Sequence, residues 1–319
     1  MHSIIDIAKQ SYPDLITCRL DDIYDEEALQ DHIASWKRLN RPVLLESDDN
    51  PKHRRQISIV EKQYEKFAFT SPGRNKDNRQ IANVDFLTRF ICDPTQPRID
   101  HSHKNKFKLL FLVGKTQPYR WDLLLALAKH DLLKGNLISL QNKQRAYSHV
   151  LPESLTLPDQ YEWQEIVDLG GFQSDALPYS KLNIAHLKNF GKVHPKLYRD
   201  TAISIVSEGS VDPGINLVTE KTWIPIVAEH LMVFQSTTGH KQFLNELGFN
   251  MNFKFIPDYD ELDHEMIADI CLDLNGQSSK SLYKKTVKQR QHNRNLALNE
   301  KHWQSYHLQQ LKNFNWDNL

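Results

Sequence analysis

The feature that most constrains the fold of this chain is an alternation of short apolar runs with longer amphipathic segments. Apolar runs of four or five residues predict buried strands, and the segments between them place apolar side chains at helical spacing. In the N-terminal part the predicted strands are 15–18, 42–46 and 66–70, and the predicted helices are 25–39 and 57–64. Strands that alternate with helices in this way are typical of a parallel sheet covered by helices.

A polar, proline-containing segment at 94–106 predicts a domain boundary near 105. Beyond this segment, predicted strands again alternate with predicted helices. The predicted strands beyond it are 107–113, 137–140, 202–206 and 231–234, and the helices are 120–134, 223–229, 239–247 and 280–298. We therefore expect an α/β protein of two Rossmann-like domains that face each other across a cleft. The expected divisions are an N-terminal domain at 1–105, a C-terminal domain at 106–275, and a helical segment at 276–319 that packs back on the N-terminal domain.

Composition excludes several classes of protein. Lys+Arg and Asp+Glu are both 40, so the net charge of +0 argues against a protein that mainly coats nucleic acid. No apolar run approaches the roughly 20 residues of a membrane helix, and the N-terminus lacks a signal-peptide pattern. The three scattered cysteines predict neither a disulfide framework nor a zinc site. We expect a cytoplasmic enzyme without a transmembrane segment.

The first candidate site follows the strand at 107–113. Gly114 permits close approach of a ligand to the backbone, and Lys115 and Arg120 carry charges that can neutralise a diphosphate. The spacing is not that of a phosphate-binding P-loop. The alternative is an ordinary turn between a strand and a helix, with both cations solvated.

The second candidate site follows the strand at 202–206. A loop begins after Glu208, and Thr219 is placed to cap the next helix. Glu220 and Lys221 then fall in the first turn, where a carboxylate can bind ribose hydroxyls and an ammonium can meet a diphosphate. The alternative is a capped helix with a surface ion pair.

These two segments carry a resemblance to a known family. Val218–Thr–Glu–Lys–Thr–Trp223, preceded by Ile205–Val–Ser–Glu208, is similar to the donor-binding motif of the α-1,3-fucosyltransferase family. The segment 113–120 resembles the first strand and loop of that family's C-terminal domain. The chain also resembles a group of uncharacterised phage and bacterial proteins that share a Leu–Gly–Phe stretch, here Leu247–Gly–Phe249. The resemblance covers roughly 107–260.

The resemblance implies a glycosyltransferase of the GT-B fold, inverting and independent of metal. Arg120 and Lys221 would hold the diphosphate of a nucleotide sugar, and Glu220 its ribose. Glu208 would order the loop or touch the donor sugar. Leu217 and Gly209 depart from the family pattern, which leaves the base and the sugar open. A GDP- or UDP-linked donor is expected, with a glycan, a lipopolysaccharide or a modified DNA base as acceptor.

An inverting transferase also needs a general base that takes the proton of the acceptor hydroxyl. No motif of the N-terminal part matches the family, so chemistry alone nominates Glu46, Asp48 and Asp49, which lie where a predicted strand ends on the side of the expected cleft. Each has the alternative of an ordinary loop carboxylate. We expect no bound metal, because lysine and arginine can neutralise the leaving diphosphate. His101–Ser–His103 has no third ligand at a telling spacing and is expected to be solvated.

A run of basic residues near the C-terminus raises other functions. Between 280 and 294 there are six cations and no acid: Lys280, Lys284, Lys285, Lys288, Arg290 and Arg294. This helix could contact an anionic surface, such as a phospholipid, a lipopolysaccharide or DNA, or it could be a solvated terminal helix. Two further functions therefore stay open: a non-catalytic nucleotide- or sugar-binding module, and a nucleic-acid-processing protein.

Overall fold

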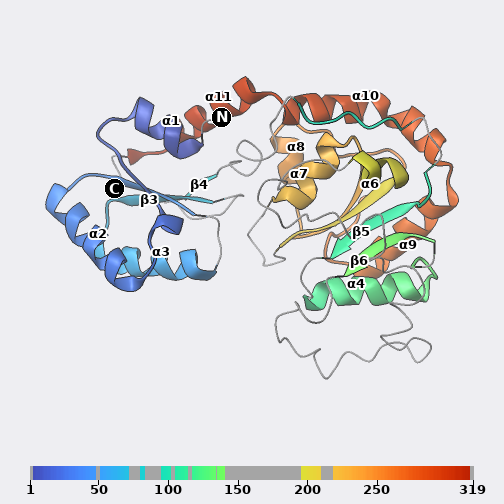
Figure 1. The fold of residues 1–319 in the computed structure, drawn as a ribbon, viewed down its shortest axis with the longest axis horizontal. Helices are drawn as coiled ribbons and strands as arrows, with labels where there is room; N and C mark the ends of the chain where they lie inside the picture. The colour runs from blue at the N-terminus through green and yellow to red at the C-terminus, as the bar shows by residue number, and fades with distance from the viewer. Residues whose placement is uncertain are drawn as a thin grey trace. The chain divides into compact units, whose positions relative to one another are not determined.

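The described part of the chain is an α/β structure with two parallel four-stranded sheets (Figure 1). The computed structural model describes residues 3–47, 51–71, 80–82, 95–101, 105–113, 117–133, 135–140, 195–209 and 218–316. The chain forms two compact units. We call Met1–Cys92, Gly214–Thr219 and Asn299–Leu319 the N-terminal unit, and Asp93–Pro213 and Glu220–Leu298 the central unit.

The sheet of the N-terminal unit has the order β1-β2-β3-β4, with every pair parallel. Its strands are β1 (Ile16–Arg19), β2 (Val43–Glu46), β3 (Phe67–Ser71) and β4 (Gln80–Ala82). Side chains alternate between the two faces. Val43 and Leu45 pack with α2 (Glu26–Leu39) and α3 (Pro51–Gln63), whereas Leu44 belongs to the core on the other face.

The second face of this sheet is covered by helices from both ends of the chain. The first is α1 (Ile4–Ser11), which begins with a capping box in which Ser3 and Asp6 bind each other's backbone N–H. The second is α11 (Glu300–Asn313). Elsewhere in this unit, a short 3₁₀ helix, η1 (Leu20–Asp22), follows β1. Ile4, Ala8 and Leu311 share one buried cluster, so the chain's last helix completes the N-terminal core.

The sheet of the central unit has the order β6-β5-β7-β8 and is also wholly parallel. Its strands are β5 (Leu109–Val113), β6 (Leu137–Leu140), β7 (Ile203–Ser207) and β8 (Leu231–Gln235). β7 and β8 are buried along their whole length, as expected for parallel strands covered on both faces.

Six described helices belong to the central unit. They are α4 (Pro118–Lys129), α6 (Pro195–Asp200), α7 (Glu220–Val227), α8 (His240–Glu246), α9 (His264–Gly276) and α10 (Ser279–Ala297). α4 packs against α9, and α10 packs against α7 (Figure 1). α8 ends before Gly248, whose φ of 94° is the left-handed conformation that glycine adopts without strain.

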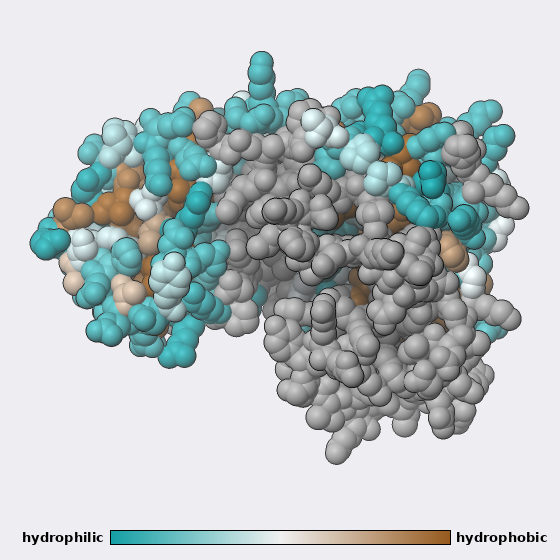
Figure 2. Space-filling model, viewed as in Figure 1, coloured by the Kyte–Doolittle hydropathy of each residue, from teal (hydrophilic) through white to brown (hydrophobic). Residues whose placement is uncertain are grey.

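The prediction of an α/β fold with two parallel sheets is confirmed. The predicted domain limits at 105 and 275 stay predictions, and the compact units divide the chain differently, with α10 in the central unit and α11 in the N-terminal unit. None of the helices in the described ranges is long and apolar enough to span a membrane. On the face drawn in Figure 2, hydrophilic side chains cover much of the described surface.

Candidate functional site

The order in which strands are added to the central sheet reverses at β5. β6 follows β5 in the sequence and lies on one side of it, whereas β7, the next described strand, lies on the other side. In open parallel sheets, ligands bind beyond the carboxyl ends of the strands at such a reversal of order. The first turns of α4 and α7 lie at this edge of the sheet, because Arg120 of α4 and Thr222 of α7 both bind Glu208, directly after β7.

Arg120 joins the first turn of α4 to the end of β7. Its guanidinium is only 3% exposed. Nε donates to Ser207 Oγ at 3.1 Å, and Nη2 donates to the carbonyl oxygens of Ser207 at 3.1 Å and Glu208 at 2.8 Å. These contacts are internal to the protein, so Arg120 fixes the strand end; a diphosphate contact for it stays a prediction.

The end of β8 belongs to the same polar network. Ser207 Oγ donates to Gln235 Oε1 at 2.9 Å, and Gln235 Nε2 donates to the carbonyl oxygen of Tyr119. The Tyr119 hydroxyl donates to the carbonyl oxygen of Glu208 at 2.8 Å. Side chains of α4, β7 and β8 therefore lock three segments of one sheet edge together. The sequence analysis gave no role to Ser207, Tyr119 or Gln235; for Ser207 and Gln235 the available signal was a polar residue at the end of an apolar run.

Glu208 is fully buried, and its carboxylate accepts a hydrogen bond from Thr222 of α7. Thr222 Oγ1 lies 2.5 Å from Glu208 Oε1 and 3.3 Å from His240 Nε2. Because the threonine hydroxyl gives its hydrogen to the carboxylate, it accepts one from His240. Burial lowers the pKa of His240, against the opposing effect of Glu208 and Glu261. Of the two roles expected for Glu208, this geometry favours ordering of the loop over contact with a sugar.

Glu220 and Lys221 form an ion pair in the first turn of α7. Lys221 Nζ lies 2.6 Å from Glu220 Oε1, and the side chains are 27% and 20% exposed respectively. Thr219 directly precedes the helix, as expected, and is partly exposed. A partly exposed pair of this kind can exchange its internal contact for a ligand, whereas Arg120 and Glu208 are buried.

The remaining predicted donor residues, Gly114 and Lys115, lie outside the described residues, as do the base candidates Asp48 and Asp49. The third base candidate, Glu46, ends β2 and is largely buried. Arg19 stands opposite it in β1, and its Nε donates to Glu46 Oε2 at 2.8 Å. The guanidinium occupies one carboxylate oxygen, which opposes use of that oxygen as a base.

No group of three or more His, Cys, Asp or Glu side chains in the described part of the chain is arranged to hold a metal. The sequence analysis overlooked one Asp-x-Asp triplet, Asp258–Tyr–Asp260, whose two carboxylates are of the kind that can hold a divalent cation. Asp258 is exposed and lies 3.7 Å from Lys241, and Asp260 accepts hydrogen bonds from Thr238 and Leu262. Both carboxylates are therefore engaged with residues of this protein, Asp258 with Lys241 of α8 and Asp260 with Thr238 and Leu262. His101 donates its Nε2 hydrogen to Ala228, and His103 lies outside the described residues.

The basic helix separates into exposed and buried cations. Lys280, Lys284, Lys285 and Lys288 are exposed on α10, whereas Arg290 and Arg294 are buried against Glu229. The alternative of a solvated terminal helix does not describe these two residues, because the helix packs on α7. An anionic partner would have the four lysines to contact.

Comparison of the chain with protein-family models, with curated proteins and with solved structures gives no match. The resemblance to the α-1,3-fucosyltransferase family stays a prediction from two short motifs.

Proposed function

We propose that the protein is a glycosyltransferase that binds a nucleotide-sugar donor on its central unit. The observation that supports this most is the Glu220–Lys221 pair, which is partly exposed in the first turn of α7. This helix follows β7, which is the neighbour of β5 at the point where the strand order reverses. A helix N-terminus in this position favours a diphosphate, because its free N–H groups and its dipole attract an anion. The proposed fold is of the GT-B type, with the acceptor bound by the N-terminal unit across a cleft.

The proposed donor site assigns one task to each charge. Binding of the donor breaks the Glu220–Lys221 pair: Lys221 meets the diphosphate, and Glu220 accepts hydrogen bonds from the ribose hydroxyls. In the transfer step, a base takes the proton of the acceptor hydroxyl while its oxygen attacks the anomeric carbon. The nucleoside diphosphate leaves from the opposite face, and Lys221 stabilises its charge. The base candidates remain Glu46, Asp48 and Asp49.

One observation favours a second function. Glu46 is bound to Arg19, which limits its use as a base. A non-catalytic module that binds a nucleotide or a sugar needs no base, and it would use the same α7 site.

The donor site is tested by thermal unfolding in the presence of GDP-, UDP-, CMP- and dTDP-linked sugars. A ligand at 100 times its Kd stabilises the folded state by about 2.7 kcal/mol, so one nucleotide class should raise the midpoint by several degrees. Lys221→Ala should abolish this rise, whereas Lys254→Ala, which removes an exposed lysine elsewhere in the central unit, should retain it. A rise that persists in Lys221→Ala would refute the assigned site, and no rise with any donor would refute the donor function.

The transfer reaction is tested with Glu46→Gln, Asp48→Asn and Asp49→Asn on a donor that binds. Loss of a general base should lower kcat by about 100-fold or more while donor affinity stays unchanged. A kcat equal to that of wild type in all three variants would exclude these residues as the general base. Donor binding by wild type without transfer to any glycan, lipopolysaccharide or DNA acceptor would favour the binding module.

A further inference from the structure

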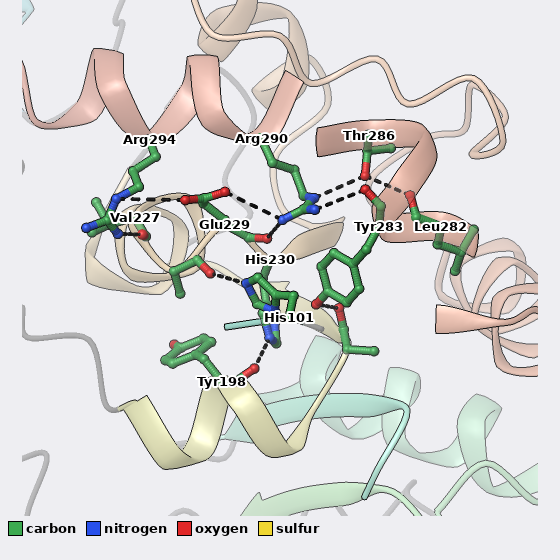
Figure 3. A network of polar contacts seen from close by, with 12 residues as sticks. His101, Tyr198, Val227, Glu229, His230, Leu282, Tyr283, Thr286, Arg290 and Arg294 are labelled. Carbon is green, nitrogen blue, oxygen red and sulfur yellow. Dashed lines mark hydrogen bonds and ion pairs between the residues drawn. The ribbon is translucent and has the colours of Figure 1, made fainter. Parts of the chain in front are cut away.

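Three donors converge on the C-terminal end of α7 (Figure 3). Arg294 Nη1 donates to the carbonyl oxygen of Val227, and His101 Nε2 donates to that of Ala228 at 2.8 Å. Arg290 Nη1 donates to that of Glu229 at 2.7 Å. The last carbonyl groups of a helix have no partner within the helix, so these side chains supply what α7 lacks.

The two buried arginines carry two positive charges, and the carboxylate of Glu229 beside them can balance only one. Arg290 and Arg294 stand one turn apart on α10 and are 4% and 3% exposed. The Glu229 carboxylate lies 3.7 Å from Arg290 and 3.9 Å from Arg294. The negative end of the α7 dipole supplies the rest of the balance. Because well-packed apolar residues can often replace buried ion pairs without loss of stability, stability alone does not explain these charges.

Each guanidinium is itself held in a fixed plane. Arg290 Nε donates to Thr286 Oγ1 at 3.0 Å, and its guanidinium carbon lies 4.3 Å from the centre of the Tyr283 ring. Arg294 Nη2 donates to the carbonyl oxygen of Gln96 at 2.7 Å. Both arginines therefore approach α7 from defined directions, as a planar fork can and a single ammonium cannot.

α7 depends on such external contacts. It has 8 residues, includes Pro225, and is too short to be stable alone. Its first half is held through Thr222 and Glu208, and its far end through the two arginines. With a rise of about 1.5 Å per residue, Val227 lies roughly 9 Å along the axis from Lys221. A shift or rotation at one end of so short a helix moves the other end with it.

We propose that Arg290 and Arg294 are positioning residues of the candidate site: they fix α7 at its C-terminal end and thereby set where Glu220 and Lys221 stand. This inference rests on the proposed donor function, because it assigns the two arginines to the placement of donor-binding groups. They act through α7 and touch no ligand.

The test compares Arg290→Met and Arg294→Met with Lys288→Met, which removes an exposed cation from the same helix. Calorimetric titration with GDP, UDP, CMP and dTDP is made well below each unfolding midpoint, so that every protein is folded. The arginine variants should bind the nucleotide that wild type binds at least 10-fold more weakly, and Lys288→Met should bind it within 2-fold of wild type. Hydrogen exchange should rise in peptides that cover α7 and stay unchanged in peptides that cover β5. If a methionine variant does not fold, Arg294→Lys, which keeps the charge and loses the fork, takes its place.

Two results would overturn the inference. Arginine variants with a lower unfolding midpoint but wild-type nucleotide affinity would show a role in stability alone. A rise in hydrogen exchange spread evenly over the central unit would show the same. If wild type binds none of GDP, UDP, CMP and dTDP, the donor function fails and the positioning role fails with it, and this result differs from equal binding by all variants.

Discussion

Glu208 has no exposed surface, and the Thr222 hydroxyl lies 2.5 Å from one of its oxygens. A carboxylate removed from water is costly unless hydrogen bonds replace its hydration. Here the replacement comes from the helix that carries the candidate donor residues, and His240 supports Thr222 in turn at 3.3 Å. At the scale of the residue, the site depends on buried polar groups that satisfy one another.

Thr222→Val tests this dependence. Valine has nearly the shape of threonine but no hydroxyl, so it leaves a buried carboxylate oxygen without this partner, and the free energy of unfolding should fall by about 1–3 kcal/mol. Thr222→Ser keeps the hydroxyl and should lose less. Urea unfolding measures both, and a valine variant as stable as the serine variant would contradict the role given to the hydroxyl.

Only some residues of the candidate site could be predicted from the sequence. The place of Glu220 in the first turn of a helix could be predicted, since an acidic residue after a threonine is typical of a helix start, whereas its role toward a donor stays a prediction. Thr222, His240 and Gln235 could not be predicted, because their meaning depends on which strands are neighbours. The sequence predicts strands but not the order β6-β5-β7-β8, which brings distant residues together.

Elements were predictable where one pattern dominates. The apolar runs that became β2, β5, β7 and β8 were found within one or two residues, because a parallel strand buried on both faces is apolar throughout. α1 and α9 were not expected. Ile4, Ile7 and Ala8 of α1 stand at helical spacing, but they span only one turn, and the second signal of this short helix is the capping box at Ser3 and Asp6.

α11 provides a test at the scale of the element. Leu311 is fully buried in the cluster with Ile4, Leu44 and Ala68, so Leu311→Ala should destabilise the N-terminal unit by about 2–5 kcal/mol. Leu39→Ala, on the exposed side of α2, should cost far less. Unfolding followed by hydrogen exchange in the β2 and β3 peptides makes the comparison. Equal effects of the two substitutions would show that α11 does not complete this core.

At the scale of the whole molecule, the central unit joins distant segments through neutral histidines. His230 Nε2 donates to the carbonyl oxygen of Tyr198 at 2.7 Å, and its Nδ1 lies 2.9 Å from Ser204 Oγ. The His101 ring stacks on Tyr283 at 4.4 Å (Figure 3). Burial is the main cause that lowers the pKa of His230 to about 3 and that of His101 to about 4; His101 contributes to the shift of His230, and Arg290 contributes to both.

These histidines predict loss of stability in mild acid. Both pKa values are lower in the folded protein than the ordinary 6.5, so the unfolded chain binds more protons below pH 6.5. Stability should be fully present above that pH and should fall as the pH drops, by up to about 1.4 kcal/mol per pH unit for each histidine, down to about pH 4 for His101 and about pH 3 for His230. Urea unfolding between pH 4.5 and 8 measures the slope. His230→Gln keeps a donor for Tyr198 and should make the slope shallower, whereas His32→Gln, which removes an exposed histidine, serves as the matched control. A slope unchanged by His230→Gln would mean that other groups govern the acid sensitivity of the central unit.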